Sequence, residues 1–160
     1  MGIEIELKFL VLGSAWRECS GTRICQGYLN RDPHRTVRVR IAGEQAYLTV
    51  KGVTQGNTRA EFEYEISVTD AEQLMALCDG PTIDKVRRKI AHGGHVWEVD
   101  EFLGQNAGLV VAEIELASED ETFSVPAWVG REVSDDSRYF NSQLATNPYC
   151  NWGVQATPQP

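Results

Sequence analysis

Apolar and polar residues alternate along residues 3–11, which read IEIELKFLV. Alternation with a period of two is typical of a β-strand that is buried on one face and polar on the other. The polar face of this segment carries two carboxylates and one ammonium group, from Glu4, Glu6 and Lys8. Such a face is compatible with a solvated surface or with a charged interior that binds an ionic ligand.

The same alternation recurs along most of the chain and predicts about eight strands. Besides residues 3–11 and a segment near Tyr28, it is found in TVRVRIA, AYLTVKG, TRAEFEYEISV, KVRRKIAH, HVWEVDEF and LVVAEIEL. Residues 42–45 and the pair Gly93 and Gly94 predict hairpin turns. Because closure of a sheet removes exposed strand edges, this pattern favours a mainly β fold, a closed antiparallel barrel with peripheral helices.

Helical patterns are few. Residues 70–79 follow a capping box formed by Thr69 and Glu72, and residues 134–146 begin with polar and acidic side chains, so a helix is predicted for each segment. A short helix is also expected around residues 14–18. No repeat or linker divides the chain, which predicts one domain over residues 1–152 and a flexible tail over residues 153–160.

Composition narrows the class of protein. A chain of 160 residues is long enough for one buried core, and no apolar run approaches the length of a membrane span. The first residues lack the pattern of a secretory signal, so a cytoplasmic location without a membrane partner is expected. A net charge of −8 disfavours nucleic-acid binding through a basic exterior.

Charged residues of one sign share a face in several of the predicted strands. Side chains two residues apart on one face are only ~7 Å apart, so like charges repel, whereas a solvated face favours mixed signs. Cations would relieve the repulsion between carboxylates, and a polyanion would relieve it between basic groups. The like-charge sets are Arg38 and Arg40; Lys85, Arg87 and Lys89; Glu98 and Asp100; Glu113 and Glu115; and Glu61, Glu63 and Glu65.

In a closed barrel these charged faces would meet in the lumen, with the apolar faces outward under helices, the reverse of a packed-core barrel. Mg²⁺ and Mn²⁺ prefer carboxylate and phosphate oxygens, and guanidinium and ammonium groups bind phosphate oxygens. The pattern therefore predicts a narrow tunnel for a slim polyphosphate and a divalent cation. The inward basic candidates are Lys8, Arg38, Arg40, Lys51, Arg59, Lys85 and Arg87.

These residues resemble the CYTH superfamily, the triphosphate tunnel metalloenzymes. The family signature E-x-E-x-K is present as Glu4, Glu6 and Lys8, and the resemblance covers about residues 3–152. It continues through QGYL, VRVR, LTVKG, EFEYEI, KVRRK, WEVDEF, AEIEL and SRYFN. The resemblance implies an eight-stranded antiparallel tunnel whose members hydrolyse or rearrange triphosphates with Mg²⁺ or Mn²⁺. Members often pair as dimers, so it also implies a homodimer as one assembly.

The resemblance also implies roles for individual residues. The principal metal would be bound by Glu4, Glu6, Glu113 and Glu115. Glu61, Glu63 and Asp100 would assist from the opposite wall, and which two of Glu61, Glu63 and Glu65 act is left open. Phosphates would be bound by Lys8, Arg38, Arg40, Lys51, Lys85 and Arg87, with Arg138 closing the end of the tunnel.

Hydrolysis requires a group that orients or deprotonates the attacking water. Candidates are Glu63, Asp100, Lys8 and Tyr28, and the alternative for Tyr28 is an aromatic packed at a strand end with its hydroxyl bonded. The chain offers no insertion for a nucleobase or thiazolium pocket, and Trp97 is expected on the apolar outer face. Inorganic triphosphate is therefore the favoured substrate. The alternatives are an organic triphosphate enzyme of the same family and a non-catalytic polyphosphate-binding module.

Overall fold

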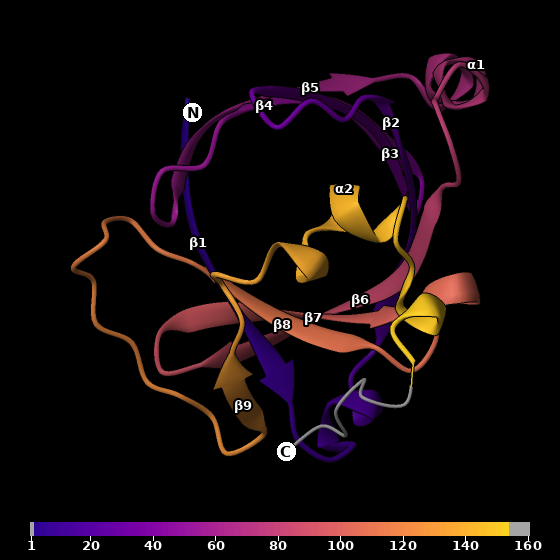
Figure 1. The fold of residues 1–160 in the computed structure, drawn as a ribbon. Helices are drawn as coiled ribbons and strands as arrows, with labels where there is room; N and C mark the ends of the chain where they lie inside the picture. Colours follow the sequence, from indigo (N-terminus) through magenta and orange to yellow (C-terminus); the bar gives the residue numbers. More distant parts are fainter. Residues whose placement is uncertain (1, 154–160) are drawn as a thin grey trace.

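The computed structural model describes residues 2–153, and its main feature is an antiparallel sheet that closes on itself (Figure 1). Eight strands follow one another around the ring in the order β5-β4-β3-β2-β6-β7-β8-β1, and β1 pairs with β5 to close it. This confirms the predicted closed barrel. The strands are β1 (Ile3–Val11), β2 (Gly21–Asn30), β3 (Arg35–Ala42), β4 (Gln45–Gly52), β5 (Thr58–Ile66), β6 (Ile83–His92), β7 (His95–Phe102), β8 (Val110–Glu115) and β9 (Val129–Glu132).

The register of the strands brings the charged residues to one side of the sheet. Glu6 lies opposite Glu115 and Lys8 opposite Glu113 where β1 pairs with β8. The closing contact of the barrel sets Glu4 of β1 opposite Arg59 of β5. Because cross-strand partners project to the same face, the alternation seen in each strand continues around the ring.

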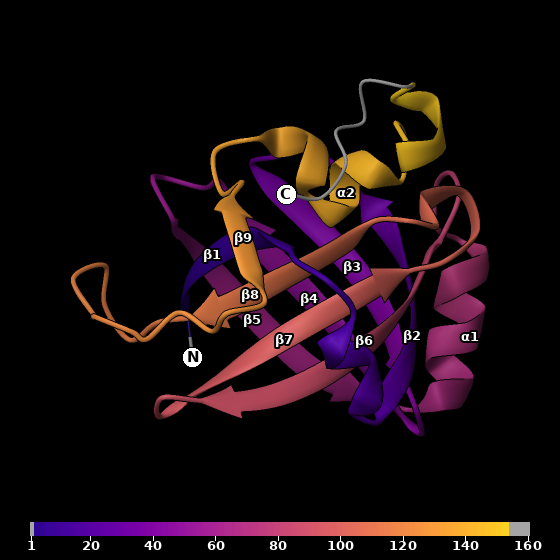
Figure 2. The same ribbon diagram turned by 90° about the horizontal axis from the view of Figure 1, so that it is seen from below.

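Apolar side chains close one end of the barrel. The inward face that carries Lys8 and Lys85 continues two residues away with Leu10 and Ile83, which belong to a buried apolar cluster. The C-terminal segment, residues 133–152, covers this end and adds Leu144, which is 0% exposed. Figures 1 and 2 show α2 (Asn141–Leu144) lying across the same end of the barrel. The lumen is thus charged along its middle and apolar at one end.

Two further apolar clusters lie on the outer surface of the barrel. One, around Val39, Ala46 and Ala71, packs beneath α1 (Val68–Ala76). The other surrounds Trp97, whose exposure is 0%, as expected for the apolar outer face. The expectation that helices cover the apolar faces is wrong for β5, where Phe62 is 47% exposed.

The helices differ from those predicted. Helix α1 begins earlier than expected because the hydroxyl of Ser67 accepts a hydrogen bond from the backbone N–H of Asp70, so Ser67 is the N-cap in place of the predicted box. The single helix predicted over residues 134–146 is wrong. Its place is taken by η3 (Ser137–Tyr139) and α2, separated by the extended Phe140.

The remaining elements complete the edges of the barrel. The short helix expected around residues 14–18 is present as η1 (Ala15–Glu18), and η2 (Gly104–Asn106) and η4 (Tyr149–Asn151) are further single turns. Strand β9, which was not predicted, pairs with β1 outside the ring. The predicted tail lies outside the described residues apart from Gly153. No helix within residues 2–153 has the length and apolarity that a membrane span requires.

The apolar end should contribute strongly to stability. Replacing Leu144 with Ala removes buried methyl groups and leaves a cavity, which should lower the free energy of unfolding by about 2 to 5 kcal/mol. Urea denaturation followed by tryptophan fluorescence would measure the loss. The matched control is Leu77→Ala, since the Leu77 side chain is 72% exposed and its truncation should change stability little. Equal effects of both substitutions would contradict the importance of the cluster.

Candidate active site

The lumen forms a cavity of about 700 Å³ that opens between charged walls. Of the residues predicted to bind metal or phosphate or to act in catalysis, all line this cavity except Asp100 and Arg138. The predicted residues that line it are Glu4, Glu6, Lys8, Tyr28, Arg38, Arg40, Lys51, Arg59, Glu61, Glu63, Lys85, Arg87, Glu113 and Glu115.

Three carboxylates from three strands converge in this cavity. Glu4 of β1, Glu61 of β5 and Glu115 of β8 each place one oxygen so that all three oxygens lie within 4.8 Å of one another. Partial burial, followed by the neighbouring charges of Glu4 and Glu61, raises the pKa of Glu115. Hard divalent cations such as Mg²⁺ take oxygen ligands of this kind. The repulsion within the cluster therefore fits a cation site.

Basic groups stabilise one member of the cluster from the opposite side. Lys51 Nζ lies 3.1 Å and Arg59 Nε 3.2 Å from Glu4 Oε1. Burial acts to raise the pKa of Glu4, but Lys51 and Arg59 outweigh it, and the net shift is downward. Lys51 also lies 3.5 Å from Glu61. Glu4 is therefore ionised, as a metal ligand must be.

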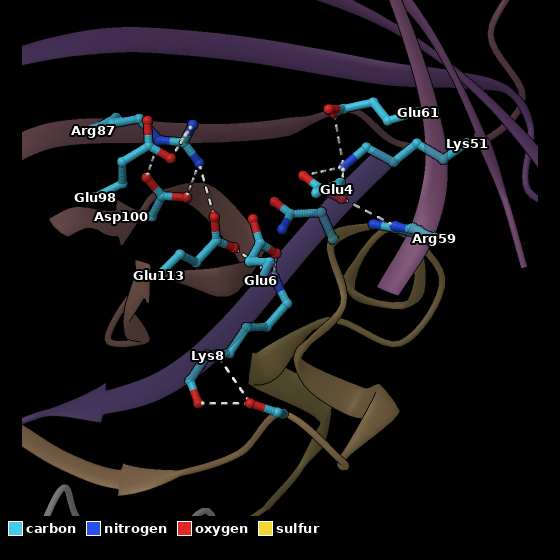
Figure 3. A network of polar contacts seen from close by, with 12 residues as sticks. Glu4, Glu6, Lys8, Lys51, Arg59, Glu61, Arg87, Glu98, Asp100 and Glu113 are labelled. Atoms are coloured by element: carbon cyan, nitrogen blue, oxygen red, sulfur yellow. Dashed lines mark hydrogen bonds and ion pairs between the residues drawn. The ribbon is translucent and has the colours of Figure 1, made fainter. Parts of the chain in front are cut away.

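The other two carboxylates predicted for the principal metal lie around Lys8 instead. Its Nζ is 3.1 Å from Glu6 Oε1, and it also forms a buried ion pair with Glu113 (Figure 3). Burial, and then the charge of Glu113, raises the pKa of Glu6 to about 7 despite the nearby ammonium group. The predicted set is thus divided, with Glu61 joining Glu4 and Glu115 while Glu6 and Glu113 pair with Lys8.

Asp100 lies behind the cavity wall, where it orients two basic side chains. Arg87 donates from Nε and Nη2 to the two carboxylate oxygens, each at 2.8 Å (Figure 3). Lys85 Nζ lies 2.8 Å from Oδ2 of the same carboxylate. Burial acts to raise the pKa of Asp100, but Arg87 and Lys85 reverse the shift and lower it to about 2. Asp100 is therefore a permanent anion that aims Arg87 and Lys85 at the cavity.

The basic wall opposite the acidic cluster holds more positive charge than its neighbours neutralise. Burial lowers the pKa of Arg40 to about 9, and the repulsion of Arg38 and Arg87 adds to the shift. Burial likewise lowers the pKa of Lys85 to about 7, although Asp100 opposes the change. A polyanion would relieve this repulsion, as the alternation of charges predicted.

Glu63 and Tyr28 occupy different environments. The carboxylate of Glu63 accepts from the Thr49 hydroxyl at 2.9 Å and from Arg38 at 3.3 Å, with its side chain 42% exposed. Tyr28 is buried, and its hydroxyl accepts from Gln26 Nε2 at 3.3 Å. The alternative anticipated for Tyr28, an aromatic packed at a strand end with its hydroxyl bonded, describes this geometry.

Arg138 is not among the residues that line the cavity. Its guanidinium forms an exposed ion pair with Asp136 at 2.6 Å and stacks over the ring of Trp152, 4.8 Å from the centroid. Trp152 belongs to the apolar cluster at the closed end of the barrel, and closure of the tunnel by Arg138 stays a prediction.

Several residues in or beside the cavity were given no functional role by the sequence, although two of them belong to the charged faces expected to meet in the lumen. Glu98 and Lys89 line it, and Glu98 lies 3.2 Å from Arg87. Both belong to the same alternating faces as the predicted residues, which is the signal that identifies them. Asn141, which lines the cavity, and the buried Gln26, which does not line it but accepts from Arg40, were missed. A neutral amide carries no charge pattern, and residue 141 was expected inside a regular helix.

Fold and cavity together define a class of protein, an antiparallel β-tunnel with an acidic cluster facing a basic wall. The model of the CYTH domain matches residues 2–146, and the chain belongs to this family.

Similarity to individual proteins also supports membership of the CYTH family. A relative from Acetivibrio thermocellus, named inorganic triphosphatase, is 50% identical over 154 residues, which cover 95% of this chain and 99% of that protein. A protein of the same name from Nitrosomonas europaea is 36% identical over 146 residues, or 89% and 96% of the two chains. The solved crystal structure of an inorganic triphosphatase superposes with a TM-score of 0.64 at 35% identity, covering 89% and 93%. A Pyrococcus furiosus structure at 21% identity, with a TM-score of 0.58 and coverage of 73% and 80%, shares the fold.

The acidic cluster makes a prediction that does not depend on turnover. Mn²⁺ should raise the unfolding temperature of the protein, because a ligand at about 100 times its dissociation constant stabilises the folded state by about 2.7 kcal/mol. In Glu115→Gln this increase should shrink, whereas in EDTA the variant should be at least as stable as the unaltered protein, since one repelling carboxylate is gone. Differential scanning fluorimetry would measure both effects.

The control for this experiment is Glu44→Gln, which removes an exposed carboxylate from the turn between β3 and β4. It should behave like the unaltered protein with Mn²⁺ and with EDTA. The assignment would be wrong if Glu115→Gln retained the full response to Mn²⁺.

Proposed function

We propose that this protein hydrolyses inorganic triphosphate to pyrophosphate and phosphate inside the charged lumen, with the assistance of Mg²⁺ or Mn²⁺. The observation that carries the proposal is the convergence of Glu4, Glu61 and Glu115 opposite a basic wall in one cavity. The names of the two relatives and the solved structure described above support it.

The chemistry of the carboxylates fits a divalent metal ion. Glu4, Glu61 and Glu115 would bind it, and Glu6 and Glu113 remain predicted ligands that lie beside Lys8. When bound, such an ion neutralises the charge that develops on phosphate oxygens during transfer.

The basic side chains of the chain fix the substrate. Arginine binds phosphate oxygens with two parallel N–H groups, and Arg38, Arg40 and Arg87 line the cavity with Lys51 and Lys85 beside them. A triphosphate bound along this wall would present its terminal phosphorus to water with the pyrophosphate group in line as the leaving group. The wall thus supplies positioning and charge stabilisation, the two main contributions to phosphoryl transfer.

The attacking water needs a proton acceptor, and Glu63 is the candidate that suits this role best. Burial acts to lower the pKa of Lys8, but Glu113 and Glu6 outweigh it and raise this pKa well above its ordinary value. Lys8 therefore stays protonated and would act as a donor to phosphate oxygens. Glu63 in contrast is an accessible carboxylate held by Thr49. Water would lose its proton to Glu63 while its oxygen bonds to phosphorus and the bond from phosphorus to the pyrophosphate oxygen breaks.

The shape of the cavity favours a slim substrate. Apolar side chains and the C-terminal segment close one end, and the residues that line the cavity are mostly charged or polar. ATP and thiamine triphosphate should therefore be poorer substrates than inorganic triphosphate. The cytoplasmic location and a homodimer stay predictions of the sequence and of its resemblance to the family.

The acidic cluster can be tested for its role in turnover. Glu61→Gln keeps the shape of the side chain but weakens its bond to a cation, and should lower kcat for triphosphate by more than about 100-fold, the scale of losing one preorganised electrostatic contact. Glu65→Gln is the matched control, since Glu65 lies on the same strand and does not line the cavity. Phosphate release measures both variants, and equal rates would contradict the assignment.

The substrate is tested by comparing phosphate release from inorganic triphosphate, ATP and thiamine triphosphate with Mg²⁺, Mn²⁺ or EDTA. Fast, metal-dependent release from inorganic triphosphate is the expected result. Preference for an organic triphosphate would contradict the proposed substrate, and tight binding without release would contradict catalysis and indicate a polyphosphate-binding module.

A further inference from the structure

Arg40 differs from the other predicted phosphate-binding residues in the kind of partner that it has. Within residues 2–153, each of the others forms an ion pair with a carboxylate, whereas Arg40 forms none. Its Nε donates instead to Oε1 of Gln26 at 2.9 Å. The guanidinium is thus fixed in direction by a neutral group, and its charge is left for another anion.

Gln26 can hold the Arg40 guanidinium in one orientation because its own side chain is buried and hydrogen-bonded at both ends of the amide. It is 0% exposed, and its Nε2 donates to the hydroxyl of Tyr28 and to Oδ1 of Asn141, each at 3.3 Å. With Arg40 on Oε1, both ends of the side-chain amide have partners. A buried amide that is satisfied at both ends has one preferred orientation.

Asn141 connects this amide to the segment that closes the barrel. Its Oδ1 also accepts from Lys85 Nζ at 2.9 Å, so one oxygen joins Gln26 and Lys85. Asn141 is the first residue of α2, and Leu144 of the same helix is fully buried in the apolar end. The C-terminal segment therefore holds the Asn141 side chain in place, and Asn141 in turn accepts from the Gln26 amide that contacts Arg40.

We propose that Gln26, supported by Asn141, is a positioning residue that presents Arg40 as an uncompensated cation to one phosphate group of the substrate. The identity of that substrate as a triphosphate rests on the proposed function. A carboxylate at residue 26 would also accept from Arg40, but it would neutralise the guanidinium and could not donate to Tyr28 and Asn141. The neutral amide allows orientation without neutralisation, which is the property that a phosphate-binding guanidinium needs.

The test exploits the fact that glutamate has nearly the shape of glutamine. Gln26→Glu should pair with Arg40 and raise the dissociation constant of inorganic triphosphate in EDTA by about 10- to 100-fold, the scale of one hydrogen bond between charged groups. Isothermal titration calorimetry measures the affinity. In turnover with metal, KM should rise by a similar factor while kcat changes by less than about threefold, because Arg40 keeps its acceptor at residue 26 although the bonds donated to Tyr28 and Asn141 are lost.

A charge-matched control separates this effect from a general change in net charge. Gln143→Glu adds one carboxylate to α2 at a residue that does not line the cavity, and should bind triphosphate like the unaltered protein. Wild-type affinity in Gln26→Glu, or equal weakening in both variants, would overturn the proposal. Failure of the unaltered protein to bind triphosphate in EDTA would also overturn it.

A second variant tests the support from α2 without adding charge, in case Gln26→Glu does not fold. Asn141→Ala removes the acceptor of both the Gln26 amide and Lys85 Nζ and should weaken triphosphate binding about 2- to 10-fold, and unchanged binding would contradict the link. Because binding is measured without metal, the outcome is independent of catalysis. The unaltered protein could bind triphosphate tightly, and lose affinity on Gln26→Glu, without releasing phosphate. That result would refute the proposed function and leave the role of Gln26 intact.

Discussion

The structure depends on the mutual compensation of charges that the barrel removes from water. Moving an ion from water into a protein interior costs several kcal/mol, and only a partner with good geometry offsets the cost. In the lumen the partners come from the same strand or from the next one. Lys8 lies between Glu6 and Glu113, while Asp100 accepts hydrogen bonds from Arg87 and forms an ion pair with Lys85. A well-packed apolar interior would serve stability at least as well. The charges are therefore better explained by ligand binding than by folding.

Compensation is incomplete at two places, and both lie in the cavity. Around Glu115 the neighbouring carboxylates outnumber the cations. Arg40 lies near Arg38 and Arg87, and within residues 2–153 it forms no ion pair with a carboxylate. The first imbalance suits a cation and the second suits an anion. The proposed metal would neutralise the excess negative charge at Glu115, and the proposed substrate would neutralise the positive charge of Arg40.

Much of the fold follows from the sequence, because strand alternation is local and the like-charge faces are visible in single strands. The composition of the acidic cluster is different: Glu61 joins Glu4 because β1 closes the ring against β5, a contact between distant segments. The helix expected over residues 134–146 failed for a related reason. Packing of Leu144 on the apolar end and the extended Phe140 override the local helical pattern.

Closure by β1 has a consequence for how the protein is made. The backbone of Lys8 donates to the hydroxyl of Ser134, 126 residues later in the chain, and β1 pairs with β8 and β9 as well as with β5. Pairings between such distant segments form slowly, because the intervening chain must first be ordered. During synthesis β1 can pair with β5 early, whereas its pairing with β8 must wait until residues 110–115 have left the ribosome. A nascent chain that lacks β8 is consequently an open, charged sheet, and the enclosed site forms only when the ring is complete.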